Sequence, residues 1–144
     1  MTLESQLYIS EFLGQDELSR ARIDKMILAA SRKNASASVT GGLIFTGKYF
    51  AQILEGEAEV IDCLMDSIAR DPRHVILRTF DRTPISARSF PSWGLAYAGP
   101  STFVSKHITC LIGGPEGANS SRAEQQLMEL MRAFAVHQAS SPAL

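Results

Sequence analysis

The hydrophobic and polar positions at the start of the chain predict a strand followed by a helix. Residues 5–12 have a strand-like centre, in which apolar and polar side chains alternate. Over residues 18–33 the spacing is helical, with apolar side chains at Ile23, Met26, Ile27 and Ala30. Asn34 follows directly, and because asparagine is a common helix terminator, we expect the helix to end there.

The next segment predicts a β-hairpin and a second helix. The sequence "SVTGGLIFTGKYFAQILEG" is typical of a strand over residues 38–45, a turn at its second "TG", and a strand over residues 48–55. Residues 57–70 then have helical spacing, with apolar side chains at Val60, Ile61, Leu64, Met65 and Ile68. This helix should end by Asp71, because the residue before a proline is pushed out of the helical region.

Two further strands, "VILRTFD" and "SWGLAYA", complete the order β-α-β-β-α-β-β. This order predicts an α+β fold, a ferredoxin-like sandwich with a five-stranded mixed sheet and two helices on one face. Several of the strands are apolar on both sides, as in "LIF" and "LYI". The second face of the sheet therefore needs a cover as well.

The C-terminal region offers such a cover. Its "SRAE" has the form of a capping box, and an apolar helical stripe follows at Ala123, Leu127, Leu130, Met131 and Phe134. We expect one domain over residues 1–98 and a helical extension over 99–144, with a linker at about 113–120 and a helix at about 121–138. That helix is expected on the sheet face opposite the other two. The stripe also suits a dimer face, so a homo-oligomer is left open.

Composition and charge narrow the function. The 144 residues are 45% hydrophobic and 20% charged, as in a globular domain, and the formal net charge is −1. Without a basic surplus we expect neither nucleic acid nor a membrane as partner, and no apolar run reaches the about 18 residues that span a bilayer. Cys63 and Cys110 lack metal-ligand spacing, so we expect no metal site and, with no signal-peptide pattern, a cytoplasmic protein.

The most informative position is a glutamine within an apolar strand. Gln52 stands in "FAQILEG", and the polar atoms of a buried amide are costly without partners. Side chains alternate across a strand, so Gln52 shares a face with Phe50, and Tyr8 shares one with Ser10. If both faces point at the helices, near Asn34, this polar cluster could orient a flat heteroaromatic ligand. The alternative is that Tyr8 alone satisfies Gln52 and that Asn34 only caps a helix.

Six motifs then occur in a fixed order: "LYIS", "AASRKN", "VTGGLIF", "YFAQILEG", "RDPRH" and "PISARSFPSWGL". Each motif is weak on its own, but the ordered set with its spacing resembles the BLUF family of blue-light receptors, whose chromophore is FAD. The resemblance runs from about residue 5 to residue 98. It implies the same ferredoxin-like fold, with the isoalloxazine ring held between the two helices.

The resemblance also implies roles for individual positions. Tyr8 matches the electron-donating tyrosine, and Gln52 matches the switching glutamine that bridges this tyrosine and the flavin N5/O4 edge. Asn34 matches the asparagine at the pyrimidine edge, and Trp93 matches the mobile tryptophan of the last strand, whose burial here is left open. The other matches lie at pocket or ribityl-phosphate positions, namely Ser10, Phe50, Asp71, Arg73 and His74.

One position departs from the family pattern. The family commonly has methionine two residues after the tryptophan, and here Leu95 stands there. A methionine thioether is flexible and polarizable and can contact an amide, whereas leucine only packs. The sequence therefore does not predict how the light signal passes from the flavin to the last strand, although it does predict flavin binding.

The resemblance predicts a blue-light photoreceptor that binds FAD non-covalently and has no catalytic activity of its own. Light-driven electron transfer from Tyr8 and a rearrangement around Gln52 would shift the absorption band to the red. We expect no output domain after residue 98, because no cyclase, phosphodiesterase or DNA-binding pattern is found there, and therefore expect a separate effector protein as partner. A non-photoactive oligomerisation or ligand-binding module is the alternative. An acylphosphatase-like hydrolase is excluded, because "SEFLGQDEL" after the first strand has neither arginine nor paired glycines.

Overall fold

The computed structural model describes residues 2–14, 17–98, 106, 108–109, 111–112, 122 and 124–133. The helices and strands follow one another as β1 (Leu3–Phe12), α1 (Glu17–Ser36), β2 (Thr40–Phe45), β3 (Tyr49–Glu57), α2 (Ala58–Ala69), β4 (His74–Thr79), β5 (Thr83–Pro84) and β6 (Trp93–Ala98). Residues 124–133 are also helical, and we call them the tail helix. In this part of the chain, no helix is both long and apolar enough to cross a membrane.

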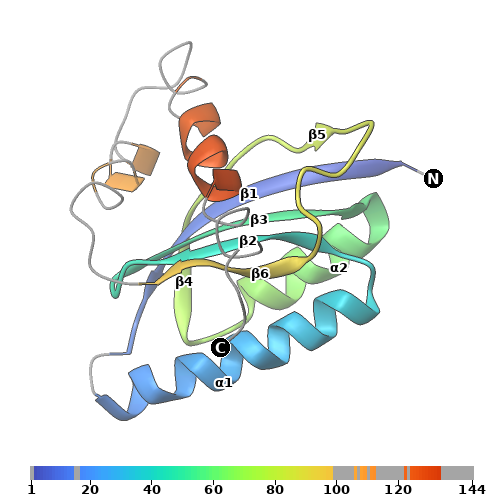
Figure 1. Cartoon of the computed structure of the whole chain (residues 1–144). Helices are drawn as coiled ribbons and strands as arrows, with labels where there is room; N and C mark the ends of the chain where they lie inside the picture. Colours follow the sequence, from blue (N-terminus) through green and yellow to red (C-terminus); the bar gives the residue numbers. More distant parts are fainter. Residues whose placement is uncertain are drawn as a thin grey trace.

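The strands form one mixed sheet in the order β4-β1-β3-β2-β6, and β5 pairs with the beginning of β1. All pairs are antiparallel except β2 with β6. Figure 1 shows α1 and α2 lying together against one face of this sheet. The ferredoxin-like α+β fold predicted from the element order is therefore confirmed, with the two-residue β5 as an addition.

The end of α1 corrects one prediction. Asn34 lies within the last helical turn, where its carbonyl oxygen accepts the Val39 N–H at 2.8 Å. The Ser38 N–H donates to the Ala35 carbonyl at 3.2 Å, and Ser38 has a φ of 58°. These bonds form a Schellman motif with Ser38 in its left-handed position. The prediction that Asn34 terminates the helix is wrong, since Ser38 makes the turn.

Gly41 allows β2 to approach β3 closely. Its φ is 145°, and a Cβ at this position would lie 1.9 Å from the Ile53 carbonyl oxygen. Only glycine fits here, because it has no Cβ and adopts positive φ freely. The Gly41 N–H donates to the Ser92 carbonyl at 3.2 Å, and Gly41 pairs with Trp93. The glycine thereby fixes where β6 begins.

Both faces of the sheet are covered. Toward α1 and α2 the core contains Leu43, Phe45, Phe50, Leu54, Ile61 and Trp93. The opposite core joins strand residues Leu7, Ile9, Ile44 and Ile53 to Leu127 and Met131 of the tail helix, both 0% exposed.

In Figure 1 the tail helix lies on the side of the sheet opposite α1 and α2, as the apolar stripe predicted. Leu130 packs against the same core. The predicted linker at 113–120, together with Ala123 and Phe134 of the stripe, lies outside the described residues. The second face is thus covered by residues of the same chain.

Candidate functional site

A cavity of about 110 Å³ lies between the sheet and the two helices. Its apolar walls come from helix and sheet residues that share hydrophobic character, namely Met26, Ile27, Ala30, Leu43, Phe50 and Ile68. Its polar lining comes from β1, β3, the turn after α2 and the start of β4, namely Tyr8, Gln52, Asp71, Arg73 and His74. An apolar slot with a few converging polar groups is the usual form of a site for a small ligand or cofactor.

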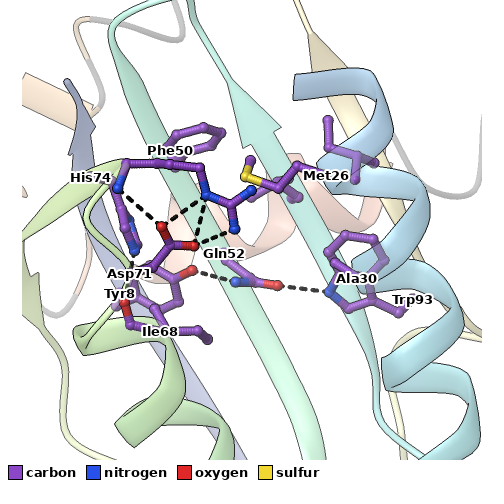
Figure 2. Close-up of a pocket in the computed structure, with 12 residues that line it drawn as sticks. Tyr8, Met26, Ala30, Phe50, Gln52, Ile68, Asp71, His74 and Trp93 are labelled. Carbon is purple, nitrogen blue, oxygen red and sulfur yellow. Dashed lines mark hydrogen bonds and ion pairs between the residues drawn. The ribbon is translucent and has the colours of Figure 1, made fainter. Parts of the chain in front are cut away.

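Gln52 lines this cavity, and Figure 2 shows both ends of its amide bonded. Its Nε2 donates to the Tyr8 hydroxyl, and its Oε1 accepts a hydrogen bond of 2.8 Å from Trp93 Nε1. Tyr8 and Gln52 stand opposite each other in the β1–β3 register, and none of the three side chains is more than 6% exposed. Gln52 therefore has two buried partners, Tyr8 and Trp93, and Tyr8 alone does not satisfy it.

The Tyr8 phenol is kept neutral by its surroundings. Burial raises the pKa of the hydroxyl well above its ordinary value; the hydrogen bond with Gln52 opposes this rise, and the Asp71 carboxylate adds to it. Because the phenol remains protonated at physiological pH, it can both accept from an amide N–H and donate to an amide oxygen. Tyr8 can therefore pair with either end of Gln52.

The turn after α2 contributes a fixed charged group. The Arg73 Nε donates to both oxygens of Asp71, at 2.8 and 3.0 Å, and this hydrogen bonding is the largest cause that lowers the pKa of the Asp71 carboxyl. His74 is held at both ring nitrogens, with Nδ1 2.7 Å from Ser10 Oγ and Nε2 2.8 Å from the Ile68 carbonyl. In the neutral ring Nε2 carries the proton, because a carbonyl can only accept.

Two of the predicted site residues do not line the cavity. Ser10 is fully buried, and its hydroxyl contacts His74, which does line the cavity. Asn34 is 4% exposed and lies one turn beyond Ala30 on the same side of α1. The lining residues of α1, such as Met26, were predicted only as an apolar helix face, because nothing in their spacing separates a core from a cavity wall.

A second cavity of about 270 Å³ adjoins the first, and both are lined by Met26 and Arg73. Arg22 of α1 also lines it, a residue that the sequence did not single out because an exposed arginine on a helix is ordinary. Guanidinium groups bind phosphate oxygens through charge-assisted hydrogen bonds. A ligand with a flat ring in the first cavity and phosphates in the second would meet groups of suitable chemistry in both.

The family model described as sensors of blue-light using FAD, BLUF, matches residues 3–96. This match covers more than half of the 144 residues, and the chain belongs to the BLUF family. Its cofactor is accordingly FAD, the chromophore by which the family is defined.

The curated relatives are much longer than this chain. The photoactivated adenylate cyclase subunit beta of Euglena longa is 35% identical over 98 residues, which cover 67% of this chain and 11% of that protein. The blue light- and temperature-regulated antirepressor BluF of Escherichia coli (strain K12) is 38% identical over 60 residues, covering 42% of this chain and 15% of that protein. Among solved structures, the dark state of the BLUF protein BlrB has a TM-score of 0.70 at 31% identity, covering 92% of this chain and 96% of that one.

The cavity residues fit a flavin ring. The flat ring requires apolar walls, and its edge of carbonyls and ring nitrogens requires a donor. The Gln52 amide carries two N–H donors, of which Tyr8 takes one, so the second can be offered to an acceptor in the cavity. Ala30 and Met26 on α1 and Ile68 on α2 supply apolar surface on the helix side.

Proposed function

We propose that this chain is a blue-light photoreceptor whose switch is the hydrogen-bonded set Tyr8, Gln52 and Trp93, with FAD bound non-covalently beside it. The observation that carries the proposal is that the buried Gln52 amide makes two hydrogen bonds, to Tyr8 and Trp93, beside a cavity in a member of a FAD-binding family. Bound FAD supplies the absorption of blue light and an acceptor for one electron. The protein supplies the electron donor, Tyr8, and an amide that can be bonded in two ways.

The remaining site residues hold the cofactor in this proposal. Asn34 would bond the pyrimidine edge of the ring, and Phe50 would pack against the ring. Asp71, Arg73 and His74 would lie along the ribityl-phosphate chain. Support for the last group is that Asp71 fixes the Arg73 guanidinium where the two cavities meet. Ser10 would keep the His74 ring in place.

The two bonding arrangements of Gln52 differ in what Trp93 can do. In the structure Gln52 Oε1 accepts from the indole N–H. If the amide presents Oε1 to Tyr8 instead, its Nε2 faces Trp93, and two donors then oppose each other because the indole nitrogen cannot accept. Tyr8 is satisfied in both arrangements, since a phenol donates and accepts. Trp93 therefore keeps its hydrogen bond in only one of the two.

We further propose that the chain has no catalytic activity of its own, acts in the cytoplasm and signals to a separate effector protein. The relatives named as a cyclase subunit and as an antirepressor share only the sensor region with this chain, which supports a module that serves different outputs. The exposed free thiol of Cys63 is suited to a reducing compartment. The alternative, a non-photoactive oligomerisation or ligand-binding module with the same fold, would show no light-induced red shift.

The purified protein is expected to be yellow and to release FAD on denaturation. Asn34→Ala should retain less FAD than Arg32→Ala, because Asn34 is buried near the cavity whereas Arg32 is exposed. Losing one hydrogen bond costs about 0.5–1.5 kcal/mol, so the Kd should rise by up to roughly tenfold. The measurement is the fluorescence of released flavin per chain. A colourless protein that takes up no added FAD would contradict the proposed function, and equal retention by the two variants would remove Asn34 from the site.

A further inference from the structure

Glu55 is a buried carboxylate that the switch described above does not use. It lies on β3, three residues after Gln52, and is 1% exposed. Its Oε1 accepts from the Thr40 hydroxyl at 2.9 Å and from the Phe90 N–H at 3.0 Å, and its Oε2 accepts from the Ser89 N–H at 2.8 Å. A buried carboxylate is costly unless donors surround it. Here the N–H groups of the successive residues Ser89 and Phe90 donate to the carboxylate. The carboxylate in turn fixes the segment 89–92, just before β6.

That segment carries one large side chain to each face of the sheet. Phe90 is 2% exposed and belongs to the core that contains the buried residues of the tail helix. Trp93, only three residues later, belongs to the core on the side of α1 and α2 and donates to Gln52. The backbone between Phe90 and Trp93 therefore joins the Gln52 amide to the opposite face of the sheet, and Glu55 holds its first residue.

A second side chain fastens the same segment. The Arg88 Nη1 donates to the Glu55 carbonyl at 2.8 Å and to the Thr40 hydroxyl oxygen at 3.0 Å. Beside these contacts lies a cavity of about 360 Å³, lined by Glu55, Phe90 and, on the tail helix, Arg132 among others. The segment is thus anchored at one end and has room to move against the tail helix.

We propose that Glu55 is a positioning residue, which holds the Ser89–Phe90 backbone. In this role it lets the making or breaking of the Trp93–Gln52 hydrogen bond change the packing of Phe90 against the core of the tail helix. This proposal rests on the proposed function. When Gln52 turns its Nε2 toward the indole, Trp93 loses its acceptor and moves. Because Glu55 keeps the start of the segment in place, the displacement acts on the Phe90 contact with the tail-side core. Without the hydrogen bonds to Glu55, the backbone before Trp93 would move with Trp93, and the Phe90 contact would not change.

Glu55→Gln tests this role with little change in volume. One carboxylate oxygen becomes an NH₂ group, which cannot accept from a backbone N–H or from a hydroxyl that donates. Thr46→Val is the matched control, because Thr46 Oγ1 likewise accepts two backbone N–H groups, from Lys48 and Tyr49 at 3.4 and 3.0 Å, in the β2–β3 turn. That turn has no bond to Trp93. Thr46→Val removes the side-chain acceptor of both N–H groups in its turn, and Glu55→Gln removes one of the two oxygens that accept from Ser89 and Phe90. Only the Glu55 change is expected to affect the switch.

The first readout needs no flavin. Trp93 is the single tryptophan of the sequence, so intrinsic fluorescence reports on it alone. Loss of a charge-assisted hydrogen bond shifts a local equilibrium by roughly tenfold or more. In flavin-free protein, the acrylamide quenching constant of Trp93 should therefore rise in Glu55→Gln toward that of the unfolded chain and stay at the wild-type value in Thr46→Val.

The second readout compares light and dark in FAD-loaded protein by hydrogen exchange over residues 124–133. Wild type and Thr46→Val should show a light-dependent change in protection, and Glu55→Gln should lose it while keeping the red shift of the flavin band. Wild-type quenching, or a preserved light-dependent change, in Glu55→Gln would overturn the proposal. Absence of any red shift in the wild type would contradict the proposed function instead. If Glu55→Gln does not fold, Thr40→Val should raise the quenching constant, and an unchanged value would overturn the proposal.

Discussion

Gln52→Leu is expected to abolish the light-induced red shift completely while the protein still binds FAD. The substitution removes both hydrogen bonds of the switch, to Tyr8 and to Trp93, but keeps most of the packing volume. Each neutral hydrogen bond contributes about 0.5–1.5 kcal/mol net, which is too little to empty a site that encloses a large aromatic ring. Tyr8→Phe should have the same effect, because it removes the electron donor's hydroxyl and leaves the ring in place.

The matched control is Gln6→Leu, the same change in a second buried glutamine. Gln6 lies on β1, is 4% exposed and donates to the Phe80 carbonyl at 2.5 Å, outside the cavity. This variant should be less stable than wild type but should keep the full red shift. A normal light-minus-dark spectrum in Gln52→Leu would remove Gln52 from the mechanism.

The second large effect is expected from the tail helix. Leu127→Ala and Met131→Ala should each lower the free energy of unfolding by about 2–5 kcal/mol, because both side chains are 0% exposed in the tail-side core. Urea unfolding of these variants and of Glu129→Ala, whose side chain is exposed, gives the comparison. Unfolding free energies equal to that of Glu129→Ala would show that the helix does not stabilise the sheet.

Deletion of residues 119–144 should destabilise the protein more than either substitution, because it removes the whole tail helix from the tail-side core. It uncovers an apolar sheet surface that includes Leu7, Ile9, Ile44 and Ile53, so the truncated protein should aggregate or change its oligomeric state. The red shift should survive wherever the protein remains folded, because the switch residues lie between Tyr8 and Trp93. A truncated chain with unchanged solubility, oligomeric state and exchange protection of the sheet would contradict this role.

The faces of the strands could be predicted from the sequence because alternation is a local property. Leu7 and Ile9 point to the tail helix while Tyr8 points to the cavity, and the β1–β3 register then sets Tyr8 opposite Gln52. The end of α1 could not be predicted in the same way. It depends on the left-handed backbone of Ser38, and serine carries no preference for that conformation as glycine does.

The site features that sequence reasoning missed depend on contacts between distant segments. Glu55 looked like the polar end of a strand, and it is buried only because Ser89 and Phe90, more than thirty residues later, fold over it. The burial of Trp93 likewise depends on distant residues, namely Leu43 and Phe50 in the core that it joins and Gln52, to which it donates. Neither arrangement leaves a periodic signal in the sequence, whereas the apolar stripe of the tail helix does.

The most direct test of the proposed switch is the absorption spectrum of the purified, FAD-loaded protein before, during and after blue light. The proposed switch predicts a small shift of the flavin band to longer wavelength, with the flavin still oxidised and full return in the dark. This result follows because only the hydrogen bonds around Gln52 differ between the two states. A flavin band that is unchanged by light, or that bleaches without shifting, would contradict the claim that Tyr8, Gln52 and Trp93 form a light-driven switch.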